Sequence, residues 1–187
     1  MTSFANDVNG NHPLYYLSAT LSSNAGNGFQ QMITINSSTY AAYEAANLSN
    51  INFQDGAGNI IPSWIESGET SGSTSTVYWI QLPNALITVV YIVFYGTSDT
   101  SKDNSVTGAE PNYTGTYAQF DNGANIFTFY DNFVGPALSA NWTTPFSTAG
   151  YVLLVSNGMT LTAGAVAGDL QISSASTYAA GTYIVDI

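Results

Sequence analysis

The chain has 187 residues, of which 12 are Asp or Glu and only one is Lys or Arg, and its formal charge at pH 7 is −11. It offers no basic patch for phosphates, which excludes a nucleic-acid partner. Its 45% of apolar residues suffices for a packed core. No apolar run reaches the roughly 18 residues of a membrane helix, so we expect no membrane insertion.

Short β-type runs fill the first half of the chain. They are rich in Ile, Val, Tyr and Thr, and clusters of Gly, Asn and Ser separate them. Residues 55–59 (DGAGN) read as a hairpin connection, because glycine supplies positive φ angles. Residues 38–48 are rich in Ala and open on Ser and Thr, which makes them the one helix-like stretch. The predicted strands are residues 14–21, 29–35, 51–54, 60–66, 76–82 and 88–95.

The second half begins with a long irregular segment. Residues 96–125 carry many turn residues and little periodicity, which indicates an extended connection. Further strands are predicted at residues 151–156, 159–162, 169–173 and 182–187, with a hairpin turn at Asn157-Gly158. The pattern predicts an all-β fold, an antiparallel β-sandwich or jelly roll. We expect an N-terminal extension (1–13), a sandwich domain (14–130) and a partial β region (131–187).

Residues 89–95 (VVYIVFY) are apolar at both alternating sets of positions. A strand of this kind is covered on both faces, so we expect it at the centre of a sheet.

Three segments in order resemble an uncharacterised domain family of microbial, especially archaeal, cell-surface proteins. They are residues 29–38 (FQQMITINSS), 60–67 (IIPSWIES) and 117–127 (YAQFDNGANIF). In that family a concanavalin-like lectin jelly roll typically follows, and residues 129–133 and 138–142 look like its start. The resemblance implies a cell-surface location and brings no catalytic residues. The part of the chain after Asn132 is too short for a complete jelly roll, so we expect a partial one. Either the chain is a fragment, or something else completes this half-domain.

Candidate catalytic groups are few. Nucleophilic catalysis needs a base beside the nucleophile, and the single His12 lies in a Gly/Asn-rich segment without a motif. Paired carboxylates could serve a glycosidase, but turn and strand-end positions explain them equally well. We expect no enzymatic activity and no cofactor. The carboxylates considered are Glu66, Glu69, Glu110, Asp121 and Asp131.

Binding sites are the remaining local hypotheses. Asp99, Asp103-Asn104 and Asp121-Asn122 could ligate calcium, although loop Asp and Asn more often form turns and neither group matches an EF-hand spacing. We therefore assign no metal site. Trp64 and Glu66 alternate and share one strand face. Tyr78 and Trp79 must face opposite ways, so only one of the two can lie in the core. A glycan-binding site would use Trp64, Glu66 and Trp79, with Tyr78, Tyr91 and Tyr95 as further stacking candidates.

Four glycosylation sequons occur, at Asn36, Asn47, Asn112 and Asn141. Chance alone would produce this number, so the sequons give candidate sites and no evidence of location. The charge composition favours an acidic setting. The chain can form almost no ion pairs, so we expect stability to change little between pH 7 and pH 3. A protein that is merely poor in Lys is the alternative.

Two functional hypotheses follow. The first is a structural subunit of an extracellular filament, thread or surface layer, polymerising with identical subunits by β-strand complementation. Residues 14–21, tethered by the Gly/Asn-rich residues 6–11, would insert as an added strand into a neighbour. The alternative is a secreted glycan-binding or adhesion module of lectin-like type.

Overall fold

The computed structural model describes residues 4–21, 26–147, 150–165 and 167–177. The chain divides into two compact units, Met1–Asp131 (unit 1) and Asn132–Ile187 (unit 2). In the described residues no helix is long and apolar enough to cross a membrane.

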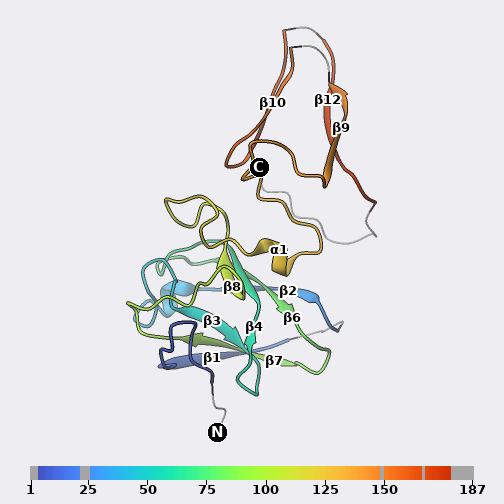
Figure 1. Ribbon diagram of the computed structural model, residues 1–187. Coiled ribbons are helices and arrows are strands. Elements are labelled where there is room, and N and C mark those ends of the chain that lie inside the picture. Colours follow the sequence, from blue (N-terminus) through green and yellow to red (C-terminus); the bar gives the residue numbers. More distant parts are fainter. Residues whose placement is uncertain (1–3, 22–25, 148–149, 166, 178–187) are drawn as a thin grey trace. The chain divides into compact units, whose positions relative to one another are not determined.

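Unit 1 is a sandwich of two four-stranded sheets (Figure 1). Sheet A has the order β1 (Tyr15–Thr20), β7 (Val89–Phe94), β3 (Ile51–Gln54), β4 (Ile60–Ile61). Sheet B has the order β2 (Phe29–Ile35), β6 (Thr76–Leu82), β5 (Ser63–Ser67), β8 (Thr107–Ala109). All neighbours are antiparallel except β5 and β8, which run parallel. The predicted all-β sandwich is therefore confirmed.

The core lies between the two sheets. Phe53 and Ile92 of sheet A pack with Tyr78 and Ile80 of sheet B, and each is at most 4% exposed. The rings of Phe53 and Tyr78 meet edge to face, with 5.1 Å between centroids. As predicted, β7 lies inside its sheet, and its neighbour Tyr95 is buried as well.

The chain changes sheet at Pro62. The run predicted as one strand, residues 60–66, is two strands, because Ile60–Ile61 belongs to sheet A and Ser63–Ser67 to sheet B. Proline lacks the N–H that a continuous ladder needs, so the break falls there. The connection 96–125 also differs from expectation, since it holds β8 and the short helix α1 (Gly123–Ile126).

The helix expected at residues 38–48 does not form. Only the 3-10 turn η1 (Ser37–Thr39) is helical, and turns follow it. The side chain of buried Asn50 binds the backbone here, accepting from the Ala45 N–H (2.8 Å) and donating to the Tyr43 carbonyl (2.9 Å). This amide holds backbone groups that a helix would pair internally, so it stabilises a turn instead.

Unit 2 consists of two antiparallel pairs. β9 (Trp142–Ser147) pairs with β12 (Leu170–Ser174), and β10 (Val152–Val155) pairs with β11 (Met159–Thr162). The Asn157-Gly158 hairpin is confirmed, with φ angles of 51° and 115°. β9 was not expected as a strand, and the strand expected at residues 182–187 lies outside the described residues. The concanavalin-like character of this unit stays a prediction.

Candidate functional site

The outer face of sheet A carries a buried polar group that an N-terminal arm covers. The arm is residues 4–21. Asn52 and Gln54 alternate with core residues along β3, so both point away from the core, toward Tyr95. All three side chains are at most 1% exposed. Asn52 Nδ2 donates to Tyr95 Oη at 2.8 Å, and Gln54 Nε2 lies 2.9 Å from the same oxygen.

These side chains bind the backbone of one arm residue. The Ala5 N–H donates to Gln54 Oε1 (2.8 Å). The Ala5 carbonyl accepts from Tyr95 Oη (3.0 Å) and Gln54 Nε2 (3.1 Å). Burial raises the pKa of Tyr95 to about 12, although hydrogen bonds from Asn52 and Gln54 oppose this, so the hydroxyl remains a donor. All of these hydrogen bonds go to the main chain of Ala5, so they do not depend on the side chain at that position.

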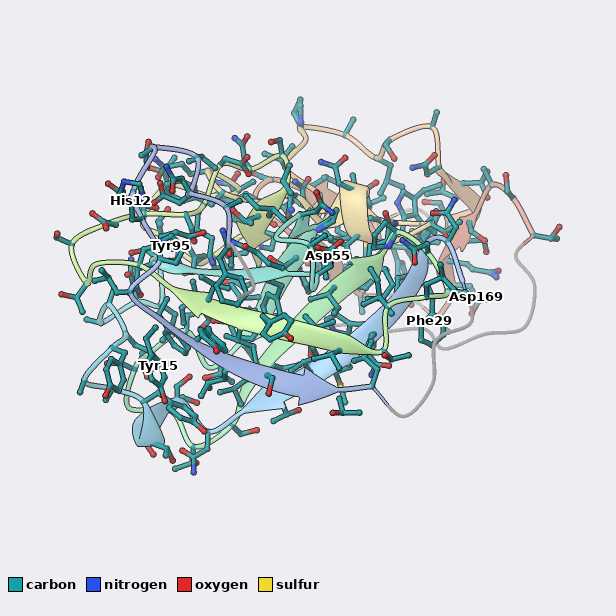
Figure 2. All side chains as sticks on the ribbon, turned by 90° about the horizontal axis from the view of Figure 1, so that it is seen from below. His12, Tyr15, Phe29, Asp55, Tyr95 and Asp169 are labelled. Carbon is teal, nitrogen blue, oxygen red and sulfur yellow. The ribbon has the colours of Figure 1, made fainter. Side chains whose placement is uncertain are left out.

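The rest of the arm joins sheet A by a complete ladder. β1 pairs with β7 at six consecutive positions, from Tyr15 opposite Phe94 to Thr20 opposite Val89. Figure 2 looks onto this sheet, with β1 and β7 side by side in front. Phe4 packs on the rings of Tyr16 (4.7 Å) and Tyr91 (5.2 Å). The arm thus covers both the edge and the outer face of β7.

A compact loop holds the arm between Ala5 and β1. Asp7 Oδ1 accepts from the N–H groups of Asn9 and Asn11, both at 2.9 Å. Asp55 makes the same bonds to Ala57 and Asn59, also at 2.9 Å. The Asp-x-x-Gly-Asn pattern therefore occurs twice, with its glycine at φ 83° and 85° in Gly10 and Gly58. Each carboxylate satisfies backbone donors without a cation.

Among the calcium candidates, Asp103 forms a turn of this kind, whereas Asp99 accepts from a residue that precedes it. Asp103 Oδ1 accepts from the N–H groups of Ser105, Val106 and Thr107, and Asp99 Oδ2 accepts from Gly96. Burial alone would raise the pKa of Asp103, but these bonds hold it below its ordinary value. Within the described ranges no three His, Cys, Asp or Glu side chains are grouped to hold a metal ion.

The glycan candidates do come together on the outer face of sheet B. Trp64 and Trp79 stand directly opposite each other on β5 and β6. Trp79 Nε1 donates to Glu66, and Trp64 Nε1 donates to Asp121 Oδ1 at 3.0 Å. Phe127 contacts both indoles, at 5.3 and 5.7 Å between ring centroids. Trp64 is only 8% exposed, so Trp79 is the candidate with stacking surface left.

The other aromatic and carboxylate candidates are dispersed. Tyr78 lies in the core and Tyr95 under the arm, each 1% exposed, and Tyr91 contacts Phe4. Asp121 Oδ1 also accepts from Tyr130 Oη at 2.8 Å. Glu66 and Asp121 therefore serve as acceptors within the aromatic cluster. Elsewhere Glu110 Oε2 accepts from the Asn112 N–H, His12 is exposed, and Glu69 and Asp131 are half-buried.

All four sequon asparagines are exposed: Asn36, Asn47, Asn112 and Asn141. Ser38 Oγ donates to Asn36 Oδ1 (2.6 Å), and the Ser49 N–H donates to Asn47 Oδ1 (3.2 Å). Tyr113 Oη donates to the carbonyl of Asn47 (2.9 Å), which places the sequons at Asn47 and Asn112 side by side.

Glu44 and Lys102 are buried ionisable residues that the sequence analysis did not identify. Glu44 is 4% exposed, and neither carboxylate oxygen has a hydrogen-bond partner, nor does the hydroxyl of buried Tyr78. Burial raises the pKa of Glu44 to about 7. The Ser37 hydroxyl opposes part of this rise without reaching hydrogen-bond geometry. Lys102 is 3% exposed, donates to the Ile51 carbonyl (3.1 Å), and burial lowers its pKa to about 7.

The sequence analysis also did not identify Asn52, Gln54 and Tyr95 as one group that binds the arm. A signal exists, because INFQ places Asn52 and Gln54 at alternate positions of an otherwise apolar strand. In a strand inside a sheet, such amides need a polar partner from another segment.

Comparisons with known proteins give one informative likeness. The chain is 36% identical over 107 residues to "Uncharacterized protein 562" of Sulfolobus islandicus rod-shaped virus 1. The match covers 56% of this chain and 18% of that protein, so the chain spans less than a fifth of its relative. No family model matches, and no solved structure matches significantly. The resemblance to cell-surface domains therefore stays a prediction.

Proposed function

We propose that the chain is a structural subunit of an extracellular cell-surface assembly, a filament, thread or layer, in which identical subunits join by β-strand complementation. The observation that carries the proposal is the arm, which supplies an edge strand to sheet A and is bound there through its backbone. An identical arm from a neighbouring subunit can make the same bonds.

The body of unit 1 needs an arm but does not need its own. Without one, β7 becomes a sheet edge, and Gln54 and Tyr95 lose their backbone partner. Unsatisfied polar groups cost about 1–3 kcal/mol each when they stay buried. We therefore expect an arm, either the chain's own or a neighbour's, on sheet A in the folded protein. Exchange between identical chains keeps every contact, and head-to-tail exchange continues indefinitely.

Composition supports an extracellular setting. The charge is low in density and almost all of one sign, and the four sequon asparagines are exposed. The viral relative carries no stated function and adds no argument for a partner.

Engineered cysteines test the exchange, because the chain has none of its own. Ser18 and Tyr91 are direct partners across β1 and β7. We would mix the single variants Ser18→Cys and Tyr91→Cys in denaturant, refold them together under assembly conditions and oxidise them. The proposal expects disulfide-linked dimers. The double variant should give a covalent ladder of multimers on a non-reducing gel.

The contrary result is equally clear. A double variant that runs as an internally linked monomer, with no dimer from the mixed singles, shows that the arm stays in its own chain. Ser18→Cys mixed with Thr97→Cys, on an exposed loop, controls for random collision.

Glycan binding is the second candidate function. The observation in its favour is the half-buried Trp79, which lies beside Glu66 and directly opposite Met32, a residue 48% exposed. Indole faces of this kind stack on sugar rings. Screening immobilised glycans with the wild type and with Trp79→Ala tests it, and equal binding by the two proteins contradicts it.

A further inference from the structure

Strand β2 is a long sheet edge without the usual protection. It forms one end of sheet B, and its seven residues, FQQMITI, contain no charge and no proline. Its register with β6 runs unbroken from Phe29 to Ile35, so no bulge bends it away. Natural proteins protect edges with charges, prolines, bulges or short strands. Phe29, labelled in Figure 2, begins this edge.

Two other sheet edges of unit 1, β4 and β8, are protected, in contrast to β2. β4 has only two residues. β8 has three, and its Gly108 lies so close to Asn122 and the Phe120 carbonyl that a side chain there would clash with both. The remaining edge, β1, belongs to the arm. β2 is therefore the long edge of the sandwich body that is open in the described residues.

The sequence of β2 is complementary to itself. In an antiparallel pair of two copies centred on Met32, Gln31 stands opposite Ile33, Gln30 opposite Thr34, and Phe29 opposite Ile35 of the second copy. No like charges meet, although each chain carries a net charge of −11. On the outer face, Met32 continues the row formed by Trp79 and Trp64.

We propose that β2 pairs antiparallel with β2 of a second copy, centred on Met32, and joins two B sheets into one eight-stranded sheet. The contact is isologous and closes after two copies. It differs from the arm exchange proposed above, which adds one subunit after another without closing. Together the two contacts would give paired strands of subunits.

The test separates this contact from arm exchange. A Ser18→Cys/Tyr91→Cys protein, refolded at high dilution and oxidised, has its arm locked in its own chain. Its mass is then measured by light scattering over a range of concentrations. The proposal expects dimers of twice 19.7 kDa. Met32→Lys places two like charges opposite each other and should raise the dimer dissociation constant about tenfold or more. Thr74→Lys, on an exposed loop, should leave it unchanged.

A locked protein that stays monomeric at all concentrations overturns the proposal, whether or not the unlocked chain polymerises. So does a Met32→Lys variant that dimerises as well as the Thr74→Lys control. To exclude misfolding as the cause of a monomer, each variant must keep the wild-type circular dichroism spectrum. In a chain with the arm intact, a Met32→Cys variant treated with a short bis-maleimide should cross-link through residue 32.

Discussion

The buried carboxyl of Glu44 predicts that unit 1 becomes more stable as the solution is acidified. Facing it are Tyr78 from β6 and Ser37 from η1, and the charge of Glu69 acts on the same Tyr78 hydroxyl. The Lys102 ammonium lies 6.0 Å from the centroid of the Tyr78 ring and makes no ion pair with Glu44. The folded-state pKa is raised from 4.5 to about 7, so the stabilisation is fully present below 4.5 and is lost as pH rises through 7.

The magnitude follows from that shift. At about 1.4 kcal/mol per pKa unit, protonation of Glu44 should contribute about 3 kcal/mol to the free energy of unfolding between pH 8 and pH 4. For a domain of this size that is roughly 10 °C in melting temperature. Glu44→Gln removes the titration but keeps the shape, so it should match the wild type at pH 4 and exceed it by about 3 kcal/mol at pH 8.

Thermal melts followed by circular dichroism from pH 4 to pH 8 check this. Glu69→Gln, a half-buried carboxylate in the 67–75 loop, is the matched control and should follow the wild-type profile. Parallel profiles for the wild type and Glu44→Gln, or a Glu44→Gln protein less stable at pH 8, would refute the reasoning. Lys102 acts in the opposite direction above about pH 7, because its lowered pKa makes stability rise with pH between about 7 and 10.5. The difference between the wild type and Glu44→Gln therefore isolates the Glu44 contribution.

Three further outcomes are expected. Tyr95→Phe removes the hydroxyl that donates to the Ala5 carbonyl and should lower the free energy of unfolding in urea by about 1–3 kcal/mol; an unchanged value would mean that the arm is held without it. Ile92→Asp buries a charge in a site 4% exposed and should abolish the cooperative melt, whereas a normal melt would exclude Ile92 from the core. Below pH 3.8 the wild type should lose stability as the hydrogen-bonded Asp103 is protonated, and Asp103→Asn should flatten that acid limb in the same melts.

The expectation of nearly constant stability between pH 7 and pH 3 rested on ion pairs alone. The chain does lack basic partners, but backbone N–H groups hold the carboxylates of Asp55 and Asp103 and lower their pKa values. These bonds and the unpaired Glu44 act in opposite directions. Below pH 7, where Lys102 does not yet titrate in either state, together they favour maximum stability near pH 4–5.

Alternation of side chains predicted most strands of unit 1. β2, β3 and β6 begin and end where the pattern places them, because a register shift would move the core-facing residues of each strand to its other face. β8 could not be predicted, since three residues, TGA, carry no periodic signal. The turns after Ser38 depend on Asn50, whose role is visible only once the chain has folded.

In the candidate sites, too, the local pattern predicted some members, while others depend on contacts between distant segments. The shared face of Trp64 and Glu66 followed from their spacing, and Trp79 joins them because its strand pairs with theirs. Phe127 and Tyr130, which cover that cluster, come from a segment more than 40 residues away, and nothing local indicated them. Burial of Glu44 and Lys102 contradicts the general tendency of charged residues to be exposed, so composition could not reveal it.

The burial of Lys102 also determines how susceptible the protein is to proteases that cleave after basic residues. It is the sole Lys or Arg in the sequence and lies inside unit 1, 3% exposed. An enzyme that cleaves after basic residues, such as trypsin, therefore finds no target on the folded surface and can cut only when the sandwich opens. The cleavage rate at this one bond reports opening of unit 1 directly, without any added label. A protein built this way resists a whole class of digestive enzymes through composition and burial alone.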